Sequence, residues 1–349
     1  MNLDKIRMEI ANSSDYTEIQ QLADASSDGG KLNFRRERHL PETHSDSGIH
    51  DRVLNIIVRD PDSDVMIGAG KMSIGECWFA GEWRPYAFVH SAIVHPSYRR
   101  RGIASRLAKF VTQLAENEAG KGVVTVAHIQ TGNKASEAAN RHWASENAGR
   151  ITLMMVPMLT SPPKRRPEIE IRPANEDDLD QIAEALLKRR WSFSIRWSPE
   201  KLRRWLSTSP SSQPINHYVV ATDSRGRLLA GIGLREEGLV QSYVVEHPSP
   251  SFRLVNHFFR VLPADGRLRN VITDKFWYAD GHRDAARGLW ETIRWEWRDR
   301  GTNLLSAHDP RGPIHTLVKP GLWFPSTSGT VMIHSSQSAD KGLIIDPIV

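Results

Sequence analysis

Both halves of the chain open on the same pattern of apolar and polar residues. Short apolar stretches at 6–10 and 169–171 predict strands. An acid-rich amphipathic segment follows each of them and predicts a helix capped at its N-terminus. Two apolar stretches joined by a turn then predict an antiparallel pair in each half, at 53–58 with 65–70 and at 217–222 with 228–233. The repeated order predicts an α/β (α+β) chain of two similar domains.

A linker separates the two halves. Residues 160–167 contain three prolines and a basic run, and they show no hydrophobic period. We therefore place a first domain at residues 1–160, a linker at 161–167 and a second domain at 168–349.

The most informative stretch is a strand, a turn and a helix in the first half. The strand ends at Ile93 and Val94, and a helical period of apolar residues follows the turn, at Leu107, Phe110, Val111 and Leu114. Such a turn directs several backbone N–H groups at one point, at the positive end of a helix dipole, which suits a diphosphate. Gly102 allows the backbone to approach the phosphates closely, and Ala104 is too small to block them.

The core of this stretch, Arg99-x-x-Gly102-x-Ala104, resembles the R/Q-x-x-G-x-G/A motif of the GCN5-related N-acetyltransferases, the GNAT superfamily. The resemblance implies that each domain has a mixed, mostly antiparallel central sheet flanked by helices. It also implies that acetyl-CoA or another acyl-CoA lies between two strands that splay apart. The residues that would bind this donor are Ile93, Val94, Arg99, Arg100, Arg101, Gly102, Ile103, Ala104, Ser105 and Asn133.

The resemblance also points to a catalytic base. Family members often carry a glutamate four residues before the position of Val94, and this chain has His90 there. Histidine titrates near pH ~6.5 and suits the role, although a strand histidine can also simply bond a neighbour. Trp143 falls where many relatives have a tyrosine that acts as the general acid, and an indole cannot take that role, so no general acid is predicted. A thiol with a pKa of ~8.5 leaves with little help.

The second domain is predicted to be degenerate. Residues 245–248 echo residues 93–96 of the first domain, but no glycine-bearing turn follows them. We therefore expect this domain to shape the substrate cleft or to act as a scaffold.

Three histidines, His39, His44 and His50, lie in the polar segment 26–51, where relatives build their acceptor site. Their spacing is not diagnostic of a metal, and no metal site is predicted.

Composition narrows the partners only slightly. A net charge of +5 and a pI near 9.3 suit an anionic ligand such as CoA or nucleic acid. The single cysteine, Cys77, rules out an internal disulfide. Because no apolar run or leader pattern is present, we expect a cytoplasmic protein without a membrane partner.

Basic and aromatic residues alternate in 188–205, which fits either RNA binding or amphipathic helices with buried tryptophans.

We therefore predict an N-acyltransferase that moves an acetyl or acyl group from CoA to the amine of a small molecule or peptide. One alternative is an amide-forming transferase that uses aminoacyl-tRNA. A second is a sensor that binds acyl-CoA without turnover.

Overall fold

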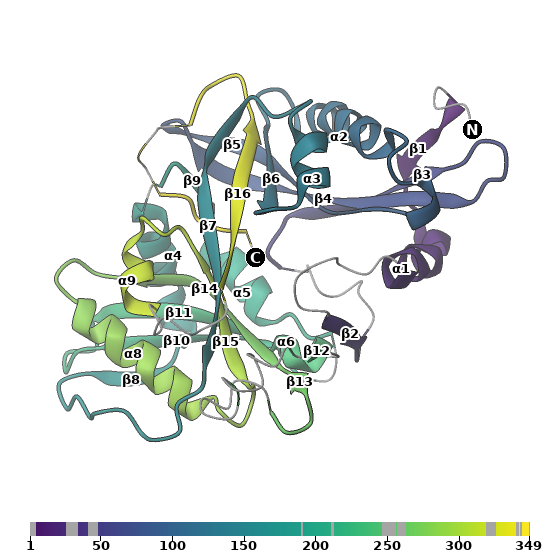
Figure 1. The fold of residues 1–349 in the computed structure, drawn as a ribbon. Coiled ribbons are helices and arrows are strands. Elements are labelled where there is room, and N and C mark those ends of the chain that lie inside the picture. Colours follow the sequence, from purple (N-terminus) through teal and green to yellow (C-terminus); the bar gives the residue numbers. More distant parts are fainter. Residues whose placement is uncertain are drawn as a thin grey trace.

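The computed structural model describes residues 5–25, 34–40, 48–189, 191–210, 213–245, 256, 263–318, 326–339, 342 and 344–348. One continuous sheet of 13 strands runs through both halves of the molecule (Figure 1). The strand order is β1-β3-β4-β5-β6-β16-β7-β15-β14-β11-β10-β8, and β9 pairs with β4 outside this path.

The first half supplies one end of the sheet. Its strands are β1 (Arg7–Ile10), β3 (Arg52–Arg59), β4 (Met66–Phe79), β5 (Glu82–Val94), β6 (Val124–Gln130) and β7 (Glu146–Pro157). The antiparallel pairing of β3 with β4 is as predicted. β5 and β6 are parallel, because α2 (Ile103–Ala119) crosses over between them.

The second half repeats this order. Its strands are β8 (Glu170–Pro173), β9 (Phe193–Ile195), β10 (Asn216–Thr222), β11 (Leu228–Arg235), β14 (Asn270–Tyr278), β15 (Asn303–His308) and β16 (Ser326–His334). β10 and β11 form the predicted antiparallel pair. β14 and β15 are parallel and joined through α8 (Arg283–Glu296), just as β5 and β6 are joined through α2.

The two halves exchange their last strands. β7, which ends the first half, pairs with β15 of the second half. β16, which ends the second half, pairs with β6 of the first half, and β7 and β16 pair with each other. The sheet is therefore continuous across the proposed boundary at 160–167, and that boundary remains a prediction.

The opening helix is capped in the same way in both halves. Asn12 and Asn175 each bond to the backbone N–H groups that follow, and Asp15 and Asp178 bond back to the capping asparagine. This reciprocal capping box leads into α1 (Tyr16–Ala25) and α4 (Leu179–Lys188). The predicted repeat is thus confirmed at the level of local hydrogen bonds.

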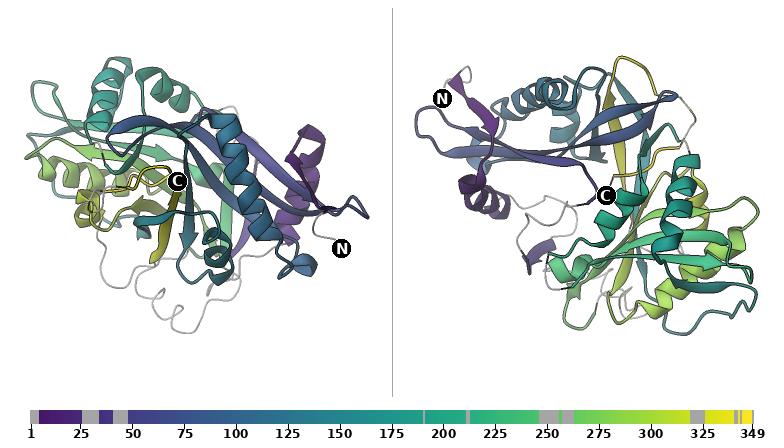
Figure 2. Two further views of the ribbon diagram at one scale, coloured as in Figure 1. Left: turned by 90° about the horizontal axis from the view of Figure 1, so that it is seen from above. Right: turned by 180° about the vertical axis from the view of Figure 1, so that it is seen from behind.

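Helices cover both faces of the sheet, as the turned views show (Figure 2). α2 buries Ile103, Leu107, Val111 and Ala115, one residue per turn, against β3, β4 and β5. α4 packs on β14 and α5 (Pro199–Leu206) packs on β10, and the buried residues of both helices belong to the largest core together with Tyr86 and Phe88 of β5. α8 covers the second half's strands. The other α-helices with bounds in the described part of the chain are α3 (Lys134–Asn140), α6 (Glu237–Val240) and α9 (Pro313–Val318).

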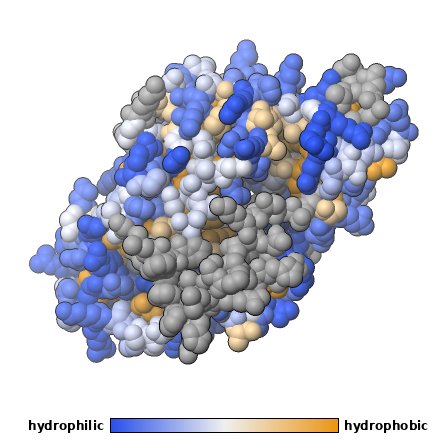
Figure 3. Space-filling model, in the orientation of Figure 1, coloured by the Kyte–Doolittle hydropathy of each residue, from blue (hydrophilic) through white to orange (hydrophobic). Residues whose placement is uncertain are grey.

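A small second sheet joins the halves away from the main one. β2 (Phe34–Arg38) of the first half pairs with β12 (Gln241–Val245), and β12 pairs with β13 (Arg267–Leu268). The face of the molecule in Figure 3 is mostly hydrophilic, because the apolar side chains are used in the cores. No described helix is long and apolar enough to cross a bilayer.

Candidate functional site

The first feature of the site is a V between β5 and β6. The two strands are in parallel register from Tyr86 opposite Val124 to Val89 opposite Ala127, and the register ends there. On the other side of β5, Ser91 and Ala92 form a bulge opposite Gly70, and Ser91 has a φ of 53°. A bulge bends its strand. β5 therefore turns away from β6 just past the last parallel pair.

The bulge leaves part of β5 exposed to the V. Ile93 and Val94 are in register with β4 on one side, and no pairing of them with β6 is present in the part of the chain that the structure describes. Their inward edge therefore offers backbone hydrogen-bonding groups to a ligand. The carbonyl of Val94 also accepts from Nε of Arg99 at 3.1 Å, which ties the end of the strand to the turn that follows.

The predicted phosphate turn lies at the mouth of this V. Gly102 adopts the left-handed conformation at a φ of 80° and ψ of 1°, and it precedes the helix without any side-chain cap. The first N–H groups of an α-helix have no partner within the helix, so those of Ile103, Ala104 and Ser105 are available to an anion. Arg100 is also left-handed, at a φ of 61°. A strained non-glycine residue beside a Gly102 turn is typical of a ligand site.

The three arginines of the turn surround these N–H groups with positive charge. Arg99 bonds to the strand end, and the guanidinium of Arg101 stacks over Tyr98 at 5.2 Å from the ring centroid. No acidic residue occupies the first turn of the helix that starts at Ile103. The turn fits a diphosphate in conformation and in charge.

His90 lies at the vertex of the V. Its Nε2 is 2.9 Å from Oγ of Ser73, and its Nδ1 is 3.2 Å from Oγ of Ser91. The ring stacks on Phe88, with centroids 4.8 Å apart and planes at 14°. The two hydroxyls and the ring of Phe88 fix the orientation of this imidazole.

A second imidazole, His128, faces the same vertex and was missed in the sequence. It follows the last parallel pair on β6, and its ring centroid is 4.9 Å from that of Phe88. Burial lowers its pKa to about 4, the charge of nearby His90 adds to this, and a hydrogen bond to the backbone of Ile348 opposes it. The sequence does contain a signal for His128. Each of the two strands carries a histidine two positions after an apolar residue, which is Phe88 in β5 and Val126 in β6.

The other predicted histidines are scattered. His50 is buried, with Nδ1 2.8 Å from the hydroxyl of Tyr86, and its ring is 6.3 Å from Phe88. His39 is near the small sheet, with Nε2 3.1 Å from Oγ of Ser242. His44 lies outside the described residues. Among the described residues there is no cluster of three His, Cys, Asp or Glu side chains that could hold a metal ion.

Asn133 caps α3. Its Oδ1 accepts from the N–H of Ser136, which is the ordinary capping role. Trp143 lies beyond the end of this helix, 9% exposed, and its Nε1 donates to Oδ1 of Asn140. Contact of Asn133 with a donor remains a prediction.

The second half contains a counterpart of the V, but not where the sequence echo placed it. β14 and β15 stay in register up to Thr273 opposite Ser306, and Lys275, at a φ of 49°, sits in a bulge like that of Ser91. The strand that corresponds to β5 is β14, so the interpretation of 245–248 as the equivalent segment is wrong, and residues 246–248 lie outside the described residues. Val245 ends β12, which belongs to the small sheet.

The turn after β14 does not resemble a phosphate site. Only residues 279–282 separate β14 from α8, whereas residues 95–102 separate β5 from α2. Gly281 is left-handed at a φ of 79°, but the acidic Asp280 and Asp284 flank this helix start, and the run of three arginines in the first half has no counterpart there. Carboxylates at a helix N-terminus repel a phosphate, so the expected loss of donor binding in this half has a physical basis.

Charged side chains and tryptophans fill this second V. The ammonium of Lys275 lies 3.7 Å from the ring centroid of Trp205 and 4.2 Å from that of Trp197, and it pairs with Asp274. Burial lowers the pKa of Lys275 to about 8. Trp197 and Trp205 are 3% and 0% exposed, so they are core residues and present no face on which a base could stack.

Beside this V lies His308, a buried histidine that should make the stability of the protein depend on pH. It is 3% exposed, and burial together with neighbouring His315 lowers its pKa to about 4. Between pH 6.5 and 4 the unfolded chain therefore binds a proton that the folded chain refuses, so stability falls as pH falls through this window. We expect His308→Gln to remove up to ~3 kcal/mol of this pH-dependent decrease in the free energy of unfolding. Urea unfolding at pH 7 and pH 5 checks it, with exposed His142→Gln as control; equal pH slopes in both variants would contradict it.

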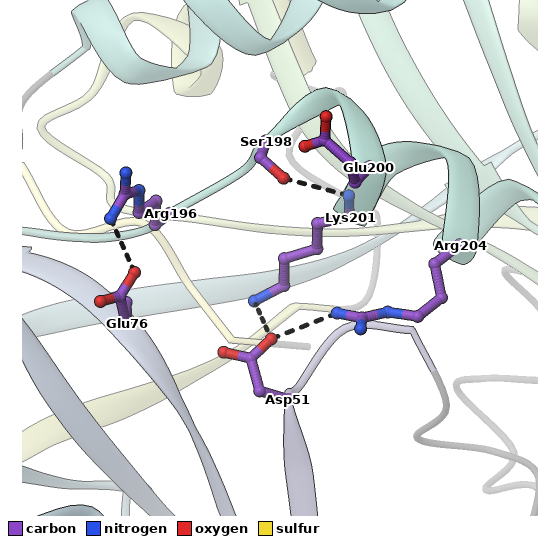
Figure 4. Close-up of a pocket in the computed structure, with 7 residues that line it drawn as sticks. All are labelled: Asp51, Glu76, Arg196, Ser198, Glu200, Lys201 and Arg204. Carbon is purple, nitrogen blue, oxygen red and sulfur yellow. Dashed lines mark hydrogen bonds and ion pairs between the residues drawn. The ribbon is translucent and has the colours of Figure 1, made fainter.

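A separate pocket of about 300 Å³ lies on the seam between the halves (Figure 4). Lys201 and Arg204 of the second half converge on Asp51 of the first, with N···O distances of 3.3 and 3.2 Å. Arg196 pairs with Glu76 at 2.8 Å. None of the residues of the V lines this pocket. The charged side chains that line this pocket form ion pairs between the two halves, so we interpret the pocket as part of the contact between them.

We expect Asp51→Ala to destabilise the protein by about 1–3 kcal/mol, because it leaves the ammonium of Lys201, only 8% exposed, without its carboxylate. Glu76→Ala is the matched control. It breaks an ion pair whose side chains are both about half exposed, which is worth less than ~1 kcal/mol. Urea denaturation of both variants checks the difference, and equal losses would overturn it.

Comparisons with known proteins agree with this geometry. The model of the Acetyltransferase (GNAT) family matches residues 29–141, a range that contains the V, the turn and α3. A comparison with curated protein sequences finds no match.

Among solved structures, N-myristoyltransferase of Saccharomyces cerevisiae with bound myristoyl-CoA is similar over 97% of this chain and 85% of its own, at a TM-score of 0.66 and 10% identity. A GCN5-related N-acetyltransferase from Kribbella flavida is similar over 96% of this chain and 72% of its own, at a TM-score of 0.54 and 16% identity. A GCN5-related N-acetyltransferase from Anabaena variabilis is similar over 95% of this chain and 73% of its own, at a TM-score of 0.55 and 11% identity. Residues 29–141 therefore match the Acetyltransferase (GNAT) family, within a chain whose overall fold is similar to that of N-myristoyltransferase and of GCN5-related N-acetyltransferases.

Proposed function

We propose that this protein is an N-acyltransferase that moves an acyl group, acetyl in the first instance, from a CoA thioester to the amine of a small molecule or peptide. One observation carries the proposal: an uncapped helix start behind a left-handed Gly102 lies at the mouth of a V whose vertex holds two imidazoles. The family match covers the same residues. Both structural neighbours named above as GCN5-related are N-acetyltransferases.

The turn binds the donor in this proposal. The backbone N–H groups of residues 103–105 and the arginines around them hold the diphosphate. The inward edge of β5 at Ile93 and Val94 holds the arm that carries the thioester. A backbone N–H on this edge stabilises the charge that develops on the thioester oxygen, which is often one of the larger catalytic effects.

His90 removes the proton from the attacking amine. An alkyl ammonium group titrates near pKa ~10, so a base at the vertex raises the fraction of reactive amine at neutral pH. The nitrogen lone pair forms the C–N bond, the C–S bond breaks, and the thiolate leaves. His90 passes the ammonium proton on to solvent, and the proton that the nitrogen loses once the C–N bond has formed goes to the thiolate. An ammonium and the thioester therefore give an amide, the free CoA thiol and one proton released to solvent.

Acyl transfer is tested with purified protein, acetyl-CoA and a panel of primary amines. We expect thiol release that depends on the amine, and an acetylated product by mass spectrometry. If acetyl-CoA binds and no amine is acylated, the protein is a sensor. If transfer occurs only with an aminoacyl-tRNA, the donor is wrong. Either result contradicts the proposal.

A further inference from the structure

The surroundings of His128 favour one tautomer of its ring. Its ring bonds to the backbone of Ile348, and this bond favours the protonated ring, as a bond donated to a carbonyl does. Its Nε2 is buried and has no partner among the described residues. We therefore assign the proton to Nδ1, which donates it to the carbonyl of Ile348, and this assignment leaves the lone pair of Nε2 free.

The ring of His128 lies against that of Phe88, beside the vertex of the V. His128 is the first residue of β6 past the last parallel pair, as His90 is on β5. Their rings flank Phe88, one stacked on it and one tilted at 58°. Both nitrogens of His90 have hydroxyl partners in Ser73 and Ser91, so His90 does not use the lone pair of His128.

A buried acceptor without a partner costs free energy, which a bound N–H group recovers. The amine of an acceptor carries such N–H groups into this vertex. His128 stays uncharged at neutral pH because burial lowers its pKa to about 4, so it acts as an acceptor of a hydrogen bond and not as a store for the proton.

We propose that Nε2 of His128 accepts a hydrogen bond from the attacking amine and directs its lone pair at the thioester, with the carbonyl of Ile348 holding the ring in place. The inference rests on the proposed function and adds a division of labour. His128 orients the amine, and His90 takes its proton. It also restricts the acceptor to nitrogens that retain an N–H in their neutral form, which means primary and secondary amines.

The kinetic test uses hydroxylamine as acceptor and acetyl-CoA as donor. Hydroxylamine is uncharged at neutral pH and needs no base, so it isolates orientation from proton removal. We expect His128→Phe, which keeps a ring but cannot accept, to lower kcat/KM for hydroxylamine about tenfold, a loss expected for one hydrogen bond. His128→Gln restores part of the rate. The Kd for acetyl-CoA stays unchanged in both. Equal kcat/KM values in wild type and His128→Phe would overturn the inference.

A second measurement does not depend on turnover. Nitrogen-15 NMR of the wild-type protein with free CoA reports both ring nitrogens of His128. We expect a proton on Nδ1 and none on Nε2, and a shift of the Nε2 resonance when hydroxylamine is added. A proton on Nε2, or no shift, rejects the role of His128. If this result is as expected while no transfer occurs, the proposed function fails and the amine site stands.

Discussion

Gly102→Val should weaken acetyl-CoA binding at least ~100-fold while the protein stays folded. Gly102 holds a φ of 80° at the start of the helix, where a β-branched residue costs ~1–3 kcal/mol and turns the following N–H groups away from the diphosphate. The added side chain also occupies the space through which the phosphates approach. Isothermal titration calorimetry with acetyl-CoA measures the change directly.

Gly120→Ala is the matched control for this result. Gly120 ends the same helix at a φ of 97°, and the space around its α-carbon is open within the described residues. It carries similar backbone strain at the opposite end from the turn. We expect this variant to bind acetyl-CoA like the wild type. If both variants bind equally well, the turn does not hold the donor.

His90→Ala should lower kcat about 100-fold at pH 7 for an alkylamine acceptor. The loss should shrink as pH rises, because solvent then removes the proton that His90 removes at neutral pH. The pH–rate profiles of wild type and variant provide the measurement.

Two further variants separate this role from a structural one. His142→Ala removes an exposed histidine beyond the end of α3 and should leave the profile unchanged. Ser73→Ala removes a hydroxyl partner of His90 and should lower kcat by a smaller factor, because the base remains. A His90→Ala profile that parallels the wild type at all pH values rules out His90 as the base.

The local patterns of the chain predicted its elements well. Apolar alternation and capping residues located the opening strand and helix of each half, and Gly102 located the turn. These features depend on residues close in the sequence, and their hydrogen bonds form between neighbours.

Features that depend on distant pairing could not be predicted in this way. Nothing in the sequence of β16 specifies that it pairs with β6, some 200 residues away, because its alternation fits any half-buried neighbour. The echo at 245–248 failed for the same reason: a Val-x-x-Pro pattern does not identify its partner strand. His128 emerged only from the parallel register of β5 and β6, which brings it beside His90.

The contact of Ile348 with His128 also required the fold. The C-terminal residues pass from Asp346, which pairs with Arg189 beside the second V, to the vertex of the first. This path exists only because the two halves share one sheet.

A crystal structure of the protein with acetyl-CoA tests the central claim most directly. We expect the diphosphate within hydrogen-bond distance of the backbone N–H groups at 103–105, and the thioester between β5 and β6 beside His90 and His128. A donor bound between β14 and β15, or in the pocket at Asp51, would contradict it.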